Sequence, residues 1–142
     1  MKVLIVNGPN LNMLGQREVN IYGKRSYKDL CNMIKKYAKK NKIKVKIYQS
    51  NEEGKLVTLI QKAKGKYQGI ICNLAAYTHT SIALLDALKV ASLPTVEVHI
   101  SDVSTRENFR QISYIRSYCQ KTISGKGLEG YLEALDFFIK GE

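Results

Sequence analysis

The 142-residue sequence has little of the short motifs by which cofactor sites and membrane segments are most readily predicted. It contains no GxxxxGKS/T, the pattern of P-loop sites, and the short glycine turn Gly125-Lys126-Gly127 before a predicted helix is too weak a signal to indicate a phosphate site. No apolar run approaches the roughly 20 residues that a membrane-spanning helix requires. The chain leads almost at once into a short apolar strand, without a signal-peptide pattern. We therefore expect a cytoplasmic protein with no cofactor and no membrane partner.

Residues that bind metals are also sparse. The three cysteines, Cys31, Cys72 and Cys119, are odd in number, widely spaced and form no CxxC pair. Free or buried thiols in a reducing compartment are the expected outcome. The two histidines, His79 and His99, have no partners at metal-ligand spacing, which predicts that the protein holds no metal.

Negative charge is the minority, because 23 lysines and arginines stand against 12 acidic residues and give a formal net charge of +11. A basic chain can attract nucleic acid. Here the lysines are spread over several predicted elements, and few aromatic residues interleave with them. We favour a solvated lysine-rich surface with no nucleic-acid partner, which raises the association rate of an anionic substrate.

What the sequence does contain is an alternation of short β-rich runs with helical periodicity. Such units predict an α/β fold with a parallel sheet covered by helices on both faces. Five strands fit a flavodoxin-like, doubly wound sheet, and no linker or repeat divides the single domain of residues 1–142. The predicted strands are 2–6, 43–48, 69–73, 95–99 and 120–124. The predicted helices are 27–41, 55–64, 79–91 and 128–140, with a helical turn near 105–110 and a capping box of Ser26 and Asp29.

Polar residues follow four of the five predicted strands. In an open parallel sheet, ligands bind at the carboxyl ends of the strands, so these residues predict one small-molecule site. The segments are Asn7-Gly8-Pro9-Asn10, Gln49-Ser50-Asn51, Asn73, and Glu97 with His99 and Ser101. A flavodoxin-like module that binds a flavin or a nucleotide is an alternative. The first segment argues against FMN, because a flavin phosphate loop is rich in serine and threonine there.

Residues 11–25 form a connection longer than the about 2–6 residues usual between a strand and a helix. It carries Gly15 and Gly23 near its ends, which suits a loop that opens and closes over a site. A disordered surface loop is the alternative. We favour a lid, because a disordered loop has little use for Arg17 and Tyr22.

Tyr22 is the candidate general base. An unperturbed tyrosine hydroxyl titrates at about pH 10 and is a weak base at neutral pH. A neighbouring guanidinium favours the phenolate, and Arg17 lies five residues away on the same loop. From spacing alone, a packed tyrosine with Arg17 in solvent remains equally open.

His99 is the candidate general acid. It alternates with Glu97 and Ser101, which places the three on one face of an extended segment. A carboxylate beside a histidine can orient the ring and hold a proton on it. A merely hydrogen-bonded histidine at a strand end is the alternative.

His79 is expected at the start of a helix, capped by Thr78 or Thr80, where free N–H groups can receive an anion. Asp86 would lie two turns further along the same face. A surface histidine with a surface aspartate is the alternative.

Two arginines and two asparagines complete the candidates. Arg106 and Arg110 are one turn apart, which suits either an anion clamp or two solvated side chains. Asn10 and Asn73 either position a water, a hydroxyl or a carboxylate, or simply form turns after strands.

Taken together, these motifs resemble the type II 3-dehydroquinate dehydratases, nearly from end to end and in that family's order and spacing. The segments that carry the resemblance are Asn7-Gly8-Pro9-Asn10-Leu11-Asn12, Leu14-Gly15-Gln16-Arg17-Glu18, Tyr22-Gly23, Gln49-Ser50-Asn51, Ala76-Tyr77-Thr78-His79-Thr80-Ser81, Glu97-Val98-His99-Ile100-Ser101 and Arg106-Glu107-Asn108-Phe109-Arg110.

The resemblance implies trans elimination of water from 3-dehydroquinate, through an enolate, to 3-dehydroshikimate in the shikimate pathway of aromatic amino acid biosynthesis. Tyr22 would remove the C2 proton with Arg17 beside it, and His99, oriented by Glu97, would protonate the departing C1 hydroxyl. Asn10 would hold a water near the C3 oxygen of the enolate. The substrate-binding residues would be Asn73, His79, Ile100, Ser101 and Arg110, with Asp86 reaching a site of a neighbouring subunit. The family forms trimers that assemble into dodecamers, so a homo-oligomer is expected.

Three positions depart from the family pattern. Leu74-Ala75 stands where Pro-Gly is usual, which implies a differently shaped turn after Asn73. Val19 replaces a proline, which implies a looser lid. Asp102 replaces an asparagine and adds a negative charge near an anionic substrate. We expect the activity to survive, because the base, the acid and the anion contacts are all present.

Overall fold

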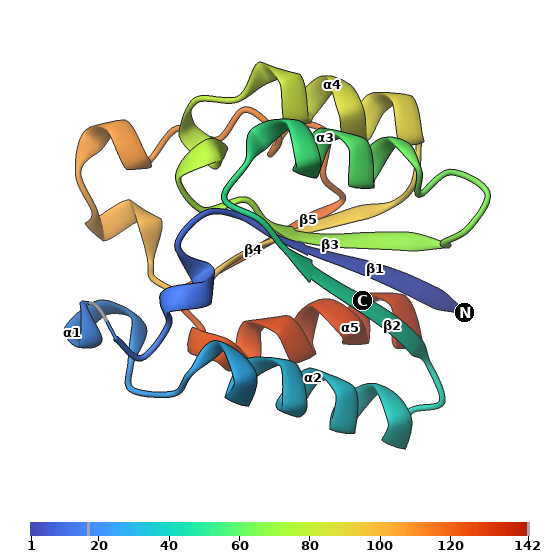
Figure 1. Cartoon of the computed structure of the whole chain (residues 1–142), viewed down its shortest axis with the longest axis horizontal. Helices are drawn as coiled ribbons and strands as arrows, with labels where there is room; N and C mark the ends of the chain where they lie inside the picture. Colours follow the sequence, from blue (N-terminus) through green and yellow to red (C-terminus); the bar gives the residue numbers. More distant parts are fainter. Residues whose placement is uncertain (17, 142) are drawn as a thin grey trace.

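The computed structural model describes residues 1–16 and 18–141. Its strands are β1 (Lys2–Asn7), β2 (Lys44–Gln49), β3 (Gly69–Asn73), β4 (Thr95–His99) and β5 (Lys121–Ser124). They form one parallel sheet in the order β2-β1-β3-β4-β5 (Figure 1). This is the flavodoxin-like order, so the predicted fold class is confirmed and each strand lies within one residue of its predicted bounds.

Helices cover both faces of the sheet. One face carries α2 (Tyr27–Lys40) and α5 (Gly130–Lys140), and the other carries α3 (Glu53–Gln61) and α4 (Ile82–Ala91) (Figure 1). A four-residue helix, α1 (Val19–Tyr22), lies within the predicted lid. The short 3-10 turns are η1 (Leu11–Met13), η2 (Ala75–His79), η3 (Val103–Thr105), η4 (Asn108–Arg110) and η5 (Gly127–Glu129).

Local capping explains where two of the helices begin. The predicted capping box of α2 is confirmed, because Asp29 N donates to Ser26 Oγ and Ser26 N donates to the Asp29 carboxylate. The prediction of a helix from residue 79 was wrong. Ser81 caps α4 by accepting from Leu84 N at 3.0 Å, and the preceding turn, η2, is a 3-10 helix.

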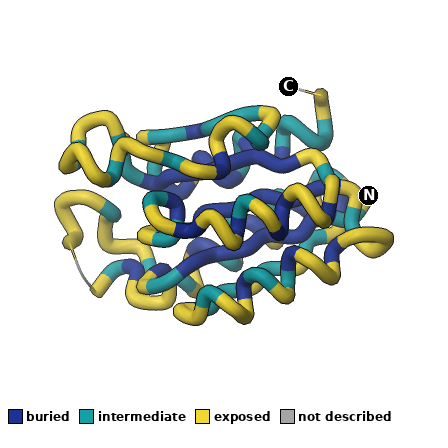
Figure 2. Tube along the Cα trace, turned by 90° about the horizontal axis from the view of Figure 1, so that it is seen from above, coloured by how far each residue is buried: buried dark blue, intermediate teal, exposed yellow. Residues whose placement is uncertain are grey.

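The sheet separates two hydrophobic cores. Val3 and Ile5 of β1 belong to the core beneath α2 and α5, and Leu4 and Val6 belong to the core beneath α3 and α4. All four are buried, because successive strand residues point to opposite faces that are both covered. Figure 2 shows the buried positions running along the strands and along the helix sides that face them.

The outer strand β2 carries part of the positive charge. Lys44, Lys46 and Tyr48 are exposed and alternate with half-buried residues. Lysines on such an open edge discourage pairing with another strand. Within the described residues, no helix is both long enough and apolar enough to cross a membrane.

Candidate active site

A cavity lies at the carboxyl ends of β1, β3 and β4, on the side of the sheet where α1 and the 3-10 turns gather (Figure 1). The loop after β1 lies next to the loop after β3, since Gly8 N donates to Asn73 O at 2.8 Å. A Cβ on Gly8 would lie 2.3 Å from Leu74 O, so only glycine permits this approach. Of the predicted site residues, those that line the cavity are Asn10, Tyr22, Asn73, His79, His99, Ile100, Ser101 and Arg110.

One of the four predicted strand ends does not reach the cavity. Gln49 Nε2 instead donates to Gly8 O at 3.1 Å, and Asn51 Oδ1 accepts from Asn10 N at 3.0 Å. The end of β2 therefore supports the loop after β1 from outside, and its expected place in the site was wrong. The support matters because Asn10 adopts a left-handed backbone conformation, with φ of 69°.

His99 and Glu97 form a buried pair at the end of β4. His99 Nε2 lies 2.7 Å from Glu97 Oε2, and Glu97 is completely buried. Ser113 Oγ donates to the same carboxylate at 2.6 Å and Thr122 Oγ1 at 2.9 Å. Burial alone would raise the pKa of the Glu97 carboxyl, but the bond and charge of His99 and the two hydroxyls outweigh it and lower that pKa to about 2. A permanently ionised Glu97 thus orients the imidazole and places a negative charge beside it.

Tyr22 has a guanidinium partner that the sequence reasoning missed. Arg106 Nη1 donates to Tyr22 Oη at 3.1 Å and to Ser101 Oγ at 3.2 Å, and its guanidinium lies 5.7 Å from the centre of the Tyr22 ring. The bond to Tyr22 raises the pKa of Arg106, so the guanidinium stays charged. A cation that donates to a phenolic oxygen stabilises the phenolate. The predicted partner, Arg17, lies outside the described residues.

Arg106 and Arg110 do not share a helix, as their spacing had suggested. Arg106 follows η3 and Arg110 ends η4, and both line the cavity. Glu107 lies between them, with its carboxylate 3.6 Å from Arg106 Nε and 3.1 Å from Arg110 Nε. The positive charge of the two arginines is therefore partly neutralised, but both still present a cation to the cavity. A fully solvated Arg106 is excluded, because only 12% of its side chain is exposed.

A buried polar network holds Asn73. Its Nδ2 donates to Tyr131 Oη at 3.1 Å, and its Oδ1 accepts from Ala75 N at 3.1 Å. Tyr131 in turn donates to Asn7 Oδ1 at 2.6 Å, and Asn7 Nδ2 donates to Tyr27 Oη. The amide of Asn73 is thereby fixed in one orientation, with the remaining hydrogen of Nδ2 available to a ligand.

His79 lies in η2 rather than at a helix start, so the expectation of Thr78 or Thr80 as its cap was wrong. Its Nδ1 lies 2.7 Å from Ile112 O, which leaves Nε2 for the cavity. Burial lowers the pKa of His79, assisted by the positive charges of His99 and Arg110. Asp86 is exposed on α4 and does not line the cavity, so the two do not share a helix face.

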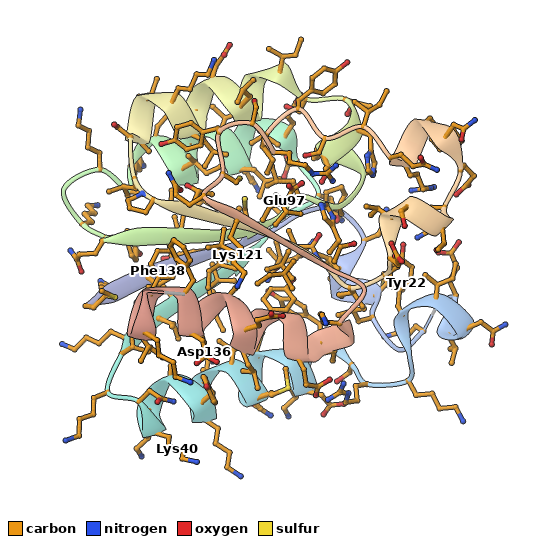
Figure 3. The ribbon with its side chains drawn as sticks, turned by 180° about the vertical axis from the view of Figure 1, so that it is seen from behind. Tyr22, Lys40, Glu97, Lys121, Asp136 and Phe138 are labelled. Atoms are coloured by element: carbon orange, nitrogen blue, oxygen red, sulfur yellow. The ribbon has the colours of Figure 1, made fainter. Side chains whose placement is uncertain are left out.

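The predicted lid is an ordered excursion within its described residues. Gly15 and Gly23 both have φ of 84°, and a Cβ on Gly15 would lie 2.7 Å from Lys24 O. The two ends of the excursion are thus in contact, and α1 between them brings Tyr22 to the cavity. Figure 3 shows Tyr22 on the far side of Glu97, beyond the end of the sheet. Glycine is required at position 15 because φ is positive there and the backbone of Lys24 lies against it.

The three departures from the family pattern have local consequences. Ala75 has φ of 52°, a left-handed conformation that an alanine adopts less readily than a glycine. Val19 is the first residue of α1, a position that suits proline. Asp102 turns to cap η3, accepting from Ser104 N at 3.0 Å, and is not among the residues that line the cavity.

The site's chemistry is that of acids and bases. It combines a tyrosine held by a guanidinium, an imidazole held by a carboxylate, and two arginines that suit an anionic ligand. In the part of the chain that the structure describes, no three His, Cys, Asp or Glu residues are grouped so that they could hold a metal ion.

Comparison with known proteins gives the same family by sequence and by structure. The family model described as "Dehydroquinase class II" matches residues 1–139. The 3-dehydroquinate dehydratases of Fusobacterium nucleatum and Thermotoga maritima are 50% and 47% identical to this chain, over 99% of it and over 97% and 96% of their own lengths. The crystal structures of type II dehydroquinase from Butyrivibrio crossotus and Propionibacterium acnes each match with a TM-score of 0.94, at 50% and 36% identity, and cover 96% and 97% of this chain and 96% and 95% of their own. The chain belongs to the class II dehydroquinase family.

Proposed function

We propose that this protein is a 3-dehydroquinate dehydratase that eliminates water from 3-dehydroquinate through an enolate. The observation that carries the proposal is the cavity in which Tyr22, bonded to Arg106, and His99, bonded to Glu97, both present their side chains. A base and an acid are what the reaction needs, because the C2 proton beside the ketone must leave and the C1 hydroxyl must depart as water. The reaction moves protons and breaks one C–O bond with no net change of oxidation state, so no redox cofactor takes part.

Tyr22 acts as the base in its phenolate form. Arg106 stabilises that form by a direct hydrogen bond, and Arg17 on the same loop is assigned the same role. Asn10 holds a water against the C3 oxygen of the enolate, where negative charge develops. Closure of the lid about Gly15 and Gly23 excludes bulk water from this step.

His99 acts as the acid. The Glu97 carboxylate holds one ring nitrogen, and the imidazolium gives the proton of its other nitrogen to the departing hydroxyl. The ring is prevented from turning away because Glu97 is itself held by hydroxyl donors.

The substrate's carboxylate and hydroxyls bind around this pair. Arg110 supplies the charge for the carboxylate. The remaining contacts are assigned to the Asn73 amide, to His79 Nε2, and to Ser101 with the backbone at Ile100.

A direct assay tests the reaction. The protein is incubated with 3-dehydroquinate at neutral pH, and the conjugated enone of the product is followed by its ultraviolet absorbance. Tyr22→Phe should reduce turnover by about 100-fold or more while ligand binding, measured by calorimetry, is retained. Tyr48→Phe, on the outer edge of β2, is the matched control and should leave turnover unchanged. Retained turnover in Tyr22→Phe would remove Tyr22 from the base role.

The proposed oligomer is a dodecamer of four trimers in which Asp86 reaches a neighbour's site. Asp86 is exposed on α4, and several large apolar side chains of α4 and of the segment around η4 are exposed too. They are Ile82 and Val90 of α4, and Phe109, Ile112 and Tyr114 of the segment around η4. Faces of this kind commonly pack against another subunit.

Mixed oligomers test the role of Asp86. Inactive Tyr22→Phe chains are unfolded and refolded together with Asp86→Ala chains. If Asp86 acts across a subunit boundary, some mixed sites carry both native residues, and activity returns above that of either variant. Activity that stays at the sum of the separate variants would show that Asp86 does not act in a neighbour's site. Light scattering of the wild type measures the number of subunits.

A cytoplasmic location is proposed from the cysteines. Cys31, Cys72 and Cys119 are free thiols. Cysteines persist in this form in reducing compartments.

A further inference from the structure

Glu97 has a second cationic partner besides His99. Arg116 Nε lies 3.5 Å from Glu97 Oε1, whereas His99 contacts Oε2. Arg116 belongs to the segment between η4 and β5, and it does not line the cavity. Its side chain is 43% exposed, so one end of a completely buried carboxylate meets a cation that reaches solvent.

The charges around Glu97 change when the acid acts. Before the proton leaves, the imidazolium and the guanidinium together outweigh the single carboxylate. After it leaves, His99 is neutral, and Arg116 alone balances Glu97. Without Arg116 the product of this step would be a buried anion compensated only by the hydroxyls of Ser113 and Thr122, and an uncompensated buried charge is strongly unfavourable.

We propose that Arg116 is a positioning residue that keeps the Glu97 carboxylate compensated while His99 gives up its proton, and so makes His99 a more effective acid. The inference rests on the proposed roles of His99 and Glu97. Arg116 does not line the cavity, and it acts through the carboxylate that it contacts. The positive charge of Arg116 also repels the imidazolium, and this too favours loss of the proton from His99.

Other ionisable groups near the pair do not replace Arg116. Within the described residues, the cations at ion-pair distance from Glu97 are His99 and Arg116. Cys72 lies opposite Glu97 in the pairing of β3 with β4, and its thiol stays neutral because a hydrogen bond to Cys119 and burial raise its pKa well above the usual value. The other charged or titratable groups of the described chain that face His99 do so across the cavity, and they are His79, Arg110, Arg106 and Tyr22.

The pH dependence of kcat tests the proposal. In Arg116→Met, the basic limb of the profile, which reports loss of the acid's proton, should move up by about 0.5 pH unit. The plateau value of kcat should fall about threefold, since a more strongly held proton is transferred less readily, while KM stays within about a factor of two. Arg116→Lys retains the charge and should restore the limb to near its wild-type position. Lys40→Met removes an equal charge from the far end of α2, distant from Glu97 (Figure 3), and should shift nothing.

Two results would overturn the proposal. A basic limb that is unmoved or moves down in Arg116→Met would refute a charge effect on the acid. So would an Arg116→Lys profile that matches Arg116→Met, since the charge would then be irrelevant. If Arg116→Met fails to fold, Arg116→Gln, with a polar side chain of similar length, is measured in its place. The variant His99→Gln distinguishes a failure of the proposed role of His99 from a failure of the proposed role of Arg116. Turnover retained in His99→Gln would refute the acid role itself. Turnover lost in His99→Gln, together with an unmoved basic limb in Arg116→Met, would refute only the role of Arg116.

Discussion

Replacement of Ala75 by glycine should relieve backbone strain directly beside the cavity. Ala75 holds φ of 52° in the turn that follows β3, where its N–H donates to the Asn73 side chain. A left-handed conformation costs a residue with a Cβ about 1–2 kcal/mol relative to glycine. Against this, glycine makes the unfolded chain more flexible and loses about 0.4–1 kcal/mol of stability. The net change for Ala75→Gly is a gain of about 0.5 kcal/mol.

The adjacent alanine isolates the strain. Ala76 is exposed and lies outside the positive-φ residues, so Ala76→Gly carries the entropic loss without the relief. The two variants should therefore differ by about 1 kcal/mol or more. An unfolding entropy of about 2.1 cal/mol/K per residue gives about 0.3 kcal/mol/K for this chain, so Tm should differ by about 3 °C.

Thermal unfolding at one fixed protein concentration measures the difference, because Tm of an oligomer depends on concentration. Ala75→Gly should unfold at the higher temperature of the pair. Equal losses of Tm in the two variants would refute the reasoning, since Ala75 would then carry no more strain than its neighbour. The same outcome would show that backbone strain in this turn does not explain why the family usually has glycine at the position of Ala75.

Three further changes probe the site and its supports. The pKa of folded Glu97 is about 2, below the value of about 4.3 for a free glutamate, so its ionisation contributes about 3 kcal/mol to the free energy of unfolding above pH 4.5, and this contribution is lost as the pH falls towards 2. In Glu97→Gln the free energy of unfolding, measured with urea, should therefore depend less steeply on pH between 4.5 and 2. A fall as steep as that of the wild type would contradict this. Gly8→Ala places a Cβ 2.3 Å from Leu74 O and should destabilise by about 1–3 kcal/mol in denaturant unfolding, with a lower kcat/KM; unchanged stability would show that the loops can separate freely. Val19→Pro, at the first position of α1, should raise stability by about 0.4–1 kcal/mol and slow proteolysis of the lid, and a lower Tm would show that the turn cannot accept proline.

Much of the fold was predictable because its causes are local. The alternation of apolar runs with helical periodicity indicated five strands and their helices, and the Ser26–Asp29 capping box marked the start of α2. The start of α4 was less evident. Thr78, Thr80 and Ser81 are all acceptable caps by type, and which of them caps the helix depends on how η2 packs against the segment that carries Ile112.

The sequence by itself determined which residues stand at the carboxyl ends of the strands, since that follows from strand length and chain order. Only the tertiary structure decided their partners. Arg106 meets Tyr22 across 84 positions of chain, and Thr122 reaches Glu97 from a neighbouring strand. Such pairs follow from the packing of loops and strands distant in sequence, which leaves no period or spacing in the sequence from which they could be predicted.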